Sequence, residues 1–229
     1  MFKYLTYTVI AMAIIYGIIL SYPGLFFDNN YEYKNFKVYT HEAVEGNIEG
    51  VLDKVYEKIS KTEFFNPDFK YRFYIVKDVG QYSFLTAFQG EGYSYVSPLG
   101  NIFLVSADFK KNKTNCKNCG EESIRDLDII MTSAATWDII RQSLKALKYI
   151  VTSNWKLIGY GEYVAGETGY FEPSEICKSK TDKVWPELYK YHLVMQMLMI
   201  KDRYPFSVVL EKHFSYEGVE KRLKKRHCR

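Results

Sequence analysis

The sequence lacks a strong excess of charge of either sign. Its 229 residues contain 31 Lys and Arg against 27 Asp and Glu, which gives a formal net charge of +4. Much of that excess falls in residues 221–229, and we expect this basic tail to be solvated rather than to contact an anionic surface. The mild balance therefore gives no reason to expect a nucleic-acid partner.

Internal repeats and low-complexity segments are also missing. Apart from an apolar N-terminal segment, about 200 residues remain, which is the length of one domain that can bury a core. Aromatic residues are plentiful, with 21 Tyr and 15 Phe, but their number alone indicates no function. The composition therefore predicts one folded domain and leaves its activity open.

Cysteine is scarce, and its spacing excludes two motifs. Cys116 and Cys119 form a C-x-x-C pair inside the polar run 110–122, without the strand and helix that flank a thioredoxin motif. A zinc knuckle would need a second such pair. In an oxidising compartment we expect a loop disulfide, either Cys116–Cys119 or one of these with Cys177, and free thiols are the alternative.

Charge is absent from residues 5–22, LTYTVIAMAIIYGIILSY. Their length is close to the roughly 20 residues that span a bilayer core. Because Lys3 precedes the run and Asp28 follows it, the sequence favours a cytoplasmic start at residues 1–4. We therefore predict a transmembrane signal anchor over 5–22, with the membrane as a partner.

Two alternatives to the anchor remain. A cleaved signal peptide would need a small-residue cleavage site, and Ser21-Tyr22-Pro23 is a poor one. A buried core helix of a soluble protein is the second alternative. Both the anchor and the cleaved peptide place the domain, residues 31–226, outside the cytoplasm. It would face the periplasm from a bacterial inner membrane or lie at the cell surface.

The apolar pattern changes from strands to helices along the chain, which predicts the α+β fold class. We expect strands at 35–40, 71–76 and 101–106, a loop or hairpin at 80–100, and helices at 44–59, 126–150, 155–165, 188–200 and from Ser215 onward. In the helix 126–150, an apolar stripe that includes Trp137 should face the core, and Asp138 should lie on the polar side. Gly159 and Gly161 each cost a helix about 1 kcal/mol relative to alanine, so we expect them where neighbouring helices approach closely.

Three segments, 71–88, 101–104 and 129–166, together resemble an outlying group of bacterial membrane-anchored proteins with a gluzincin-type metallopeptidase fold. The third segment carries most of the resemblance, through WKLIGYGEYV at 155–164. In that family one helix carries H-E-x-x-H, and a following W-x-x-E-G-[YLF]-[AC]-E-Y-[VI] helix supplies a third metal ligand. The resemblance implies a zincin-like domain, a small sheet with helices.

The family's residues are suited to zinc. Two His at i and i+4 reach one metal from the same helix face, and the Glu beside the first acts on the bound water as general base. In this chain Ser133 and Trp137 stand at the two His positions, Ala134 stands at the Glu, and Ile158 stands at the third ligand. The resemblance therefore implies a vestigial site, without metal or cofactor.

A second register places Trp137, Asp138 and Arg141 on the motif. This register also lacks zinc ligands, because the Trp137 indole offers only a hydrogen-bond donor and the Arg141 guanidinium is permanently charged. The histidines do not restore a site, because none pairs with another at helical spacing: they are His41, His192, His213 and His227. No G-x-S-x-G elbow and no recognisable Cys–His arrangement is present either.

Three functions remain open from the sequence. The first is a non-catalytic pseudopeptidase domain that binds a peptide or protein partner in the old cleft, near Trp137, Arg141, Tyr160 and Tyr163. The second is a structural or interaction protein whose cleft is closed by Trp137. The third, which the residues favour least, is a hydrolase that uses unrecognised residues. An open groove beside Trp137 would favour the first over the second.

Overall fold

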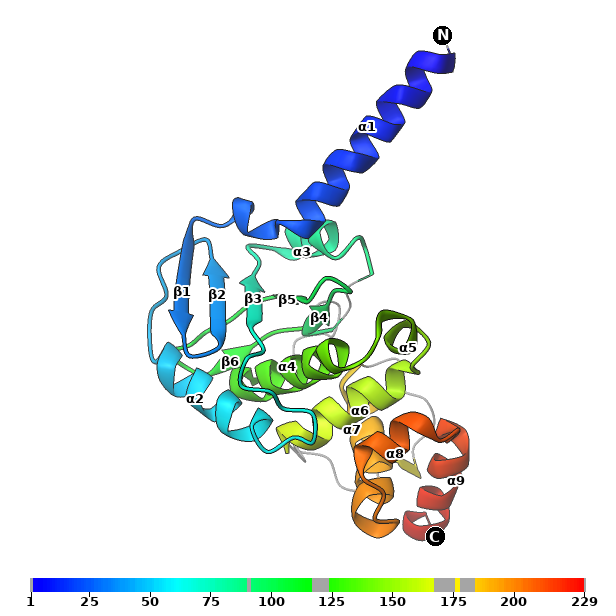
Figure 1. Ribbon diagram of the computed structural model, residues 1–229. Helices are drawn as coiled ribbons and strands as arrows, with labels where there is room; N and C mark the ends of the chain where they lie inside the picture. Colours follow the sequence, from blue (N-terminus) through cyan, green and yellow to red (C-terminus); the bar gives the residue numbers. More distant parts are fainter. Residues whose placement is uncertain (1, 90–91, 117–123, 167–175, 178–183, 229) are drawn as a thin grey trace.

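The computed structural model describes residues 2–89, 92–116, 124–166, 176–177 and 184–228 (Figure 1). The helices are α1 (Phe2–Ser21), α2 (Ile48–Ile59), α3 (Val79–Leu85), α4 (Leu127–Ser143), α5 (Ala146–Ile150), α6 (Asn154–Ala165), α7 (Val184–Gln196), α8 (Phe206–Glu211) and α9 (Tyr216–His227), with a 3-10 turn η1 (Pro23–Phe26) and a π-helical turn η3 (Met197–Lys201). The strands are β1 (Asn29–Tyr33), β2 (Phe36–Thr40), β3 (Tyr71–Ile75), β4 (Ser94–Val96), β5 (Asn101–Leu104), β6 (Lys113–Thr114) and β7 (Arg125–Asp126). The predicted α+β class is confirmed.

The main sheet has the strand order β1-β2-β3-β5-β4. Its three central strands, β2, β3 and β5, run parallel, and the edge strands β1 and β4 pair antiparallel with their neighbours. Because successive side chains of a strand point to opposite faces, Phe73 and Tyr74 of β3 belong to different cores. The sheet is therefore buried on both faces.

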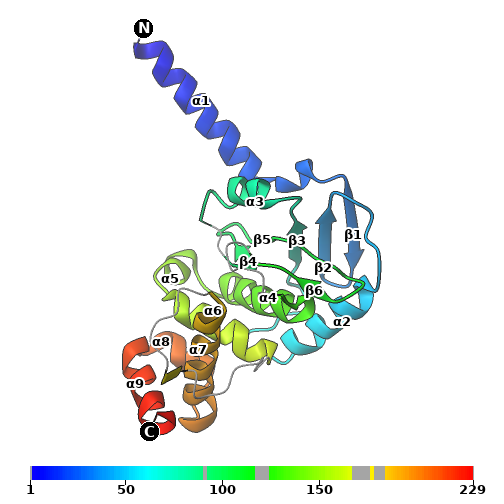
Figure 2. The ribbon, with the colours of Figure 1, turned by 180° about the vertical axis from the view of Figure 1, so that it is seen from behind.

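Two helical layers cover one face of the sheet (Figures 1 and 2). The first consists of α2 and α4, whose apolar residues share a core with alternate residues of β2, β3 and β5. Beyond α4 lie α6, α7, α8 and α9, which form a second core. On the opposite face α3 packs through Tyr82 and Leu85 against Tyr74 and Phe103.

Two polar links and a ring stack hold α8 against α6. The Lys156 Nζ donates to the backbone oxygens of Val209 and Lys212, at 2.7 and 2.9 Å. The Tyr160 ring stacks on Phe206, with 3.7 Å between ring centroids. The lysine thus binds carbonyls at the end of α8, where helical oxygens lack partners within the helix.

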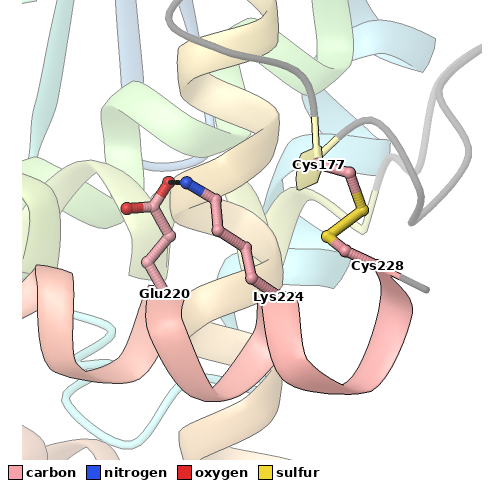
Figure 3. The surroundings of a disulfide bond; sticks show 4 residues. All are labelled: Cys177, Glu220, Lys224 and Cys228. Carbon is pink, nitrogen blue, oxygen red and sulfur yellow. Dashed lines mark ion pairs between the residues drawn. A yellow bond between two sulfur atoms is a disulfide. The ribbon is translucent and has the colours of Figure 1, made fainter.

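A disulfide joins Cys177 to Cys228, which directly follows α9 (Figure 3). The predicted alternative, in which Cys177 pairs with the C-x-x-C motif, is therefore wrong. Cys116 is also disulfide-bonded. Its expected partner, Cys119, lies outside the described residues.

The predicted transmembrane signal anchor over residues 5–22 is wrong. In the described part of the chain, no helix combines the length and the apolar character that crossing a membrane requires. The end of α1 instead packs on the domain: the Tyr16 hydroxyl donates to the Phe84 oxygen at 2.6 Å.

The two glycines of α6 lie where two helices approach closely, as predicted. A Cβ on Gly161 would lie 2.7 Å from the Ser133 backbone oxygen on α4. A Cβ on Gly159 would lie 2.8 Å from the Tyr191 oxygen on α7. Since real Cβ contacts are longer, only glycine lets α6 pack between these two helices.

We therefore expect Gly161→Ala to destabilise the protein by about 1–3 kcal/mol, the usual cost of overpacking a core. Gly17→Ala, on α1, is the matched control, because a Cβ at Gly17 would have no neighbouring atom within 4 Å. That control should be neutral or slightly stabilising, since alanine favours helices. Urea unfolding of both variants measures the difference, and equal stabilities would contradict this account of the α4–α6 contact.

Candidate functional site

A cavity of about 630 Å³ lies between the edge strand β4 and the helices α4, α5 and α6. Ligand cavities in proteins commonly measure about 300–1,000 Å³, so the space suits a bound group. Most of its walls are apolar or aromatic, and the described lining residues include Tyr95, Val96, Ile130, Ser133, Ala134, Trp137, Tyr149, Leu157, Ile158, Glu162 and Leu188. This cavity is the candidate site.

All four positions that the resemblance marks as vestigial line this cavity. Ser133, Ala134 and Trp137 reach it from α4, where residues four apart share a face. Ile158 reaches it from α6, one turn before Glu162. The four residues that the sequence pattern groups therefore lie around one cavity. Their positions do not test whether the protein binds a metal or has an activity.

The three residues expected beside the cleft lie elsewhere. Tyr160 is buried against Phe206, and Tyr163 packs near Tyr160 and His192. The Arg141 side chain pairs with Asp138, at 2.5 Å between Nε and Oδ1, and packs against Gly100. Among the described residues that line the cavity, none of these three appears.

A buried ion pair lies at the base of the cavity. The Arg125 guanidinium, from β7, donates to Glu162 Oε2 at 2.7 Å, and the two side chains are only 3% and 6% exposed. The Ser133 hydroxyl donates to Glu162 Oε1 at 2.9 Å. Both carboxylate oxygens therefore have a donor, and the charge of Glu162 is neutralised within the protein.

These residues do not fit a zinc ion. Ser133, Trp137 and Ile158 offer a hydroxyl, an indole and an alkyl group instead of imidazoles and a carboxylate, and Glu162 is engaged by Arg125 and Ser133. In the described ranges, no three His, Cys, Asp or Glu side chains are grouped as a metal site requires. The donor set therefore supports no metal-assisted step.

One wall of the cavity combines aromatic rings with a polar hydroxyl. Burial raises the pKa of Tyr149 to about 12, although the neighbouring Trp137 indole lowers that pKa in part. The Tyr149 hydroxyl is therefore neutral near pH 7 and can both donate and accept a hydrogen bond. Such a wall suits an apolar group that carries one or two polar atoms.

The edge strand β4 lies beside this cavity, and within the described ranges only β5 pairs with it. The Val105 amide donates to the Tyr93 oxygen and the Ser97 amide to the Asn101 oxygen, so residues 93, 95 and 97 pair with β5. By the same alternation, the amide and carbonyl of Ser94 and Val96 point to the outer edge. Since β4 ends the sheet, this edge has no further strand in the described part of the chain.

Asp138 is fully buried, which corrects its predicted place on the polar face. Arg141 and Gln142 both donate to its carboxylate, the amide of Gln142 at 2.7 Å. Burial raises the pKa of Asp138, and the two donors oppose that rise. Asp138 is a satisfied structural carboxylate on α4, and it does not line the cavity.

Comparison with known proteins yields no relative: no protein-family model, no curated protein and no solved structure matches this chain. The resemblance to gluzincin-type proteins therefore remains a hypothesis that depends on the residues quoted for it. Glu162 lies within the motif at 155–164, but the sequence patterns indicated no role for it or for Arg125. No local motif marks Arg125, because its partner is distant in the sequence.

We expect Glu162→Gln to destabilise the protein by about 3–5 kcal/mol, because it removes a buried carboxylate that neutralises the Arg125 charge at 2.7 Å. Glu57→Gln is the control, since Glu57 pairs with Lys61 on the surface and should contribute little. Replacing the whole pair, with Arg125→Met and Glu162→Leu, should recover part of the loss. Denaturant unfolding measures all three, and a Glu162→Gln variant as stable as Glu57→Gln would refute this role.

The raised pKa of Asp138 predicts a pH dependence of stability. The folded state holds this proton more tightly than the unfolded state, whose Asp pKa is about 3.9. The resulting stabilisation is fully present below that value and is lost as pH rises through the folded pKa. The variant Asp138→Asn has no such proton, so it should not lose this stability as pH rises. The unfolding free energy of the variant, relative to that of the wild type, should therefore rise with pH above about 4.

Asp53 provides the control for this measurement. Hydrogen bonds from Lys34 and Tyr33 lower its pKa, so its contribution is present at high pH and is lost as pH falls. Asp53→Asn should therefore change the pH profile in the opposite direction. Unfolding free energies measured from pH 2 to 8 separate the two, because the Asp53 contribution is lost only below about pH 4 and the Asp138 contribution only above it. Parallel profiles for the wild type and Asp138→Asn would contradict the assignment.

Proposed function

We propose that this protein is a non-catalytic, gluzincin-like domain that binds an extended peptide in the cavity between β4 and α4. The observation that carries the proposal is the outer edge of β4, which has no partner strand among the described residues and lies beside a cavity with apolar walls. An extended peptide can add to such an edge through main-chain hydrogen bonds, while its side chains enter adjoining pockets. Ser94 and Val96 supply the edge, and the cavity supplies the pocket.

The walls of the cavity indicate which peptide would bind. Trp137, Tyr149 and Ile158 offer aromatic and aliphatic surface, and the only charged lining residue in the described part, Glu162, is neutralised by Arg125. A large apolar or aromatic side chain would therefore be favoured. A charged side chain would lose its hydration without gaining a partner.

The open cavity supports this function over a closed, purely structural cleft. Trp137 is half-buried and forms part of the wall, which leaves space beside it. The unsuitable donor set at Ser133, Trp137 and Ile158 supports the absence of peptidase activity. The resemblance supplies the gluzincin part of the proposal, and it depends mainly on residues 155–164.

The disulfides support a location outside the cytoplasm. Cys177 pairs with Cys228, and Cys116 is also oxidised. Structural disulfides persist in oxidising compartments and are rare where thiols are kept reduced. The domain would therefore meet its peptide in a secreted, periplasmic or surface environment.

Peptide display on the full chain tests the binding function. The wild type should enrich sequences with an aromatic or large aliphatic residue. Ile158→Asp should reduce binding at least about tenfold, because it places a charge in the apolar wall. Ser94→Pro should weaken binding severalfold, because it removes an outward amide without breaking the β4–β5 ladder. Val79→Glu, on exposed α3, is the control and should bind normally.

Two outcomes would overturn the proposal. If the wild type enriches no peptide, or if all three variants bind equally, the cavity is not a peptide site. One equivalent of zinc by elemental analysis, together with peptide cleavage that a chelator abolishes, would refute the non-catalytic part. Elemental analysis and a peptide-library digest should therefore accompany the display experiment.

A further inference from the structure

A second cavity, of about 300 Å³, lies between α9 and the α7–η3 helix, and its lining residues fall between positions 193 and 227. Its described lining residues are Leu193, Gln196, Met197, Ile200, Lys201, Leu223, Arg226 and His227. The volume is at the lower end for ligand cavities, so a small molecule is the appropriate occupant. None of these residues lines the cavity beside β4.

The floor of this second cavity is apolar. Leu193 and Leu223 are 5% exposed and belong to the C-terminal core. Met197 is half-buried, and Ile200 is 49% exposed, large for an aliphatic side chain in a folded domain. An apolar ligand that covered Ile200 would remove this surface from water, at about 25 cal/mol for each Å² buried.

The rim of the cavity is cationic. Lys201 and Arg226 supply its charge beside His227, and neither of these two cations pairs with a carboxylate in the part of the chain that the structure describes. Other cations of α9 do have partners: Arg222 pairs with Asp202 at 2.8 Å, and Lys224 with Glu220 at 3.0 Å (Figure 3). Arg226, at the rim of the cavity, is therefore one of the cations of α9 that no described carboxylate neutralises.

Two local features fix the walls that carry these groups. Met197, Ile200 and Lys201 belong to the π-helical turn η3, a rare conformation that often occurs at functional sites. Arg226 and His227 immediately precede Cys228, whose disulfide to Cys177 holds the end of α9 (Figure 3). The cationic groups are thus borne by constrained backbone on both sides of the cavity.

The helix dipole offers a simpler reason for these cations. Positive side chains in the last turn of a helix interact favourably with its free carbonyl groups. This effect explains why Arg226 stands in the last turn of α9. It does not explain a cavity with an apolar floor beside them, or the convergence of Lys201 from another helix on the same space.

We propose that this cavity binds a small amphiphilic carboxylate, a molecule with a short apolar chain and one anionic head. The chain would lie on Leu193 and Leu223, and the carboxylate would meet Arg226 and Lys201. Guanidinium groups bind carboxylates through paired, charge-assisted hydrogen bonds. This binding is independent of the peptide site beside β4.

Calorimetric titration of the full chain with octanoate tests the proposal. Octanoate should bind with one-to-one stoichiometry, whereas octanol and inorganic phosphate, which each lack one half of the ligand, should bind much more weakly. Arg226→Gln should weaken octanoate at least about tenfold, as expected for loss of a charge-assisted hydrogen bond. Lys201→Gln should act in the same direction.

Lys221→Gln is the matched control. Lys221 is an exposed cation on the same helix and does not line the cavity, so this variant should bind octanoate like the wild type. If octanol binds as well as octanoate, or if Arg226→Gln and Lys221→Gln behave alike, the cavity is not a carboxylate site. A lower melting temperature of Arg226→Gln with unchanged octanoate affinity would leave the helix dipole as the whole explanation.

Discussion

The arrangement of the site depends on the buried contact between Arg125 and Glu162. Arg125 comes from β7, directly before α4, and Glu162 comes from α6, so the pair fixes these two helices relative to one another. Ser133 adds a hydrogen bond from the facing side of α4. Such a pair is costly to desolvate, and its geometry must be good for it to persist. Gly161 makes that geometry attainable, because its missing side chain lets the α4 and α6 backbones meet.

Much of the element order could be read from the sequence. The strands that became β2, β3 and β5 alternate or are rich in β-forming residues. The expected start of α9 is capped by Ser215, whose side-chain oxygen accepts a hydrogen bond from the Gly218 amide. The short helix α3 was missed, because residues 80–100 are rich in Gly, Ser and Tyr and were expected to form a loop or hairpin. The helix α3 depends on the Asp78 cap and on the burial of Tyr82. The burial of Tyr82 is a tertiary contact, which the local sequence does not show.

The candidate site was predicted in part. The spacing between the two helical motifs placed Ser133, Trp137 and Ile158 around one space, as the structure does. The error at Asp138 has a physical cause: α4 is buried on nearly every side, so its polar residues do not mark a solvent face. Arg125, the edge of β4 and the Cys177–Cys228 pairing come from contacts between distant segments, which single-sequence patterns do not encode.

The Cys177–Cys228 bond also closes part of the chain into a covalent ring, because the bonded residues are 51 positions apart. On a chain-entropy view, a ring of that size restricts the unfolded state by about 4 kcal/mol. It also changes how damage to this region would be seen. A peptide bond cut between the two cysteines would leave the fragments linked, so α8 and α9 would stay attached to the rest of the molecule. Such a cut would be visible as separate fragments only after reduction.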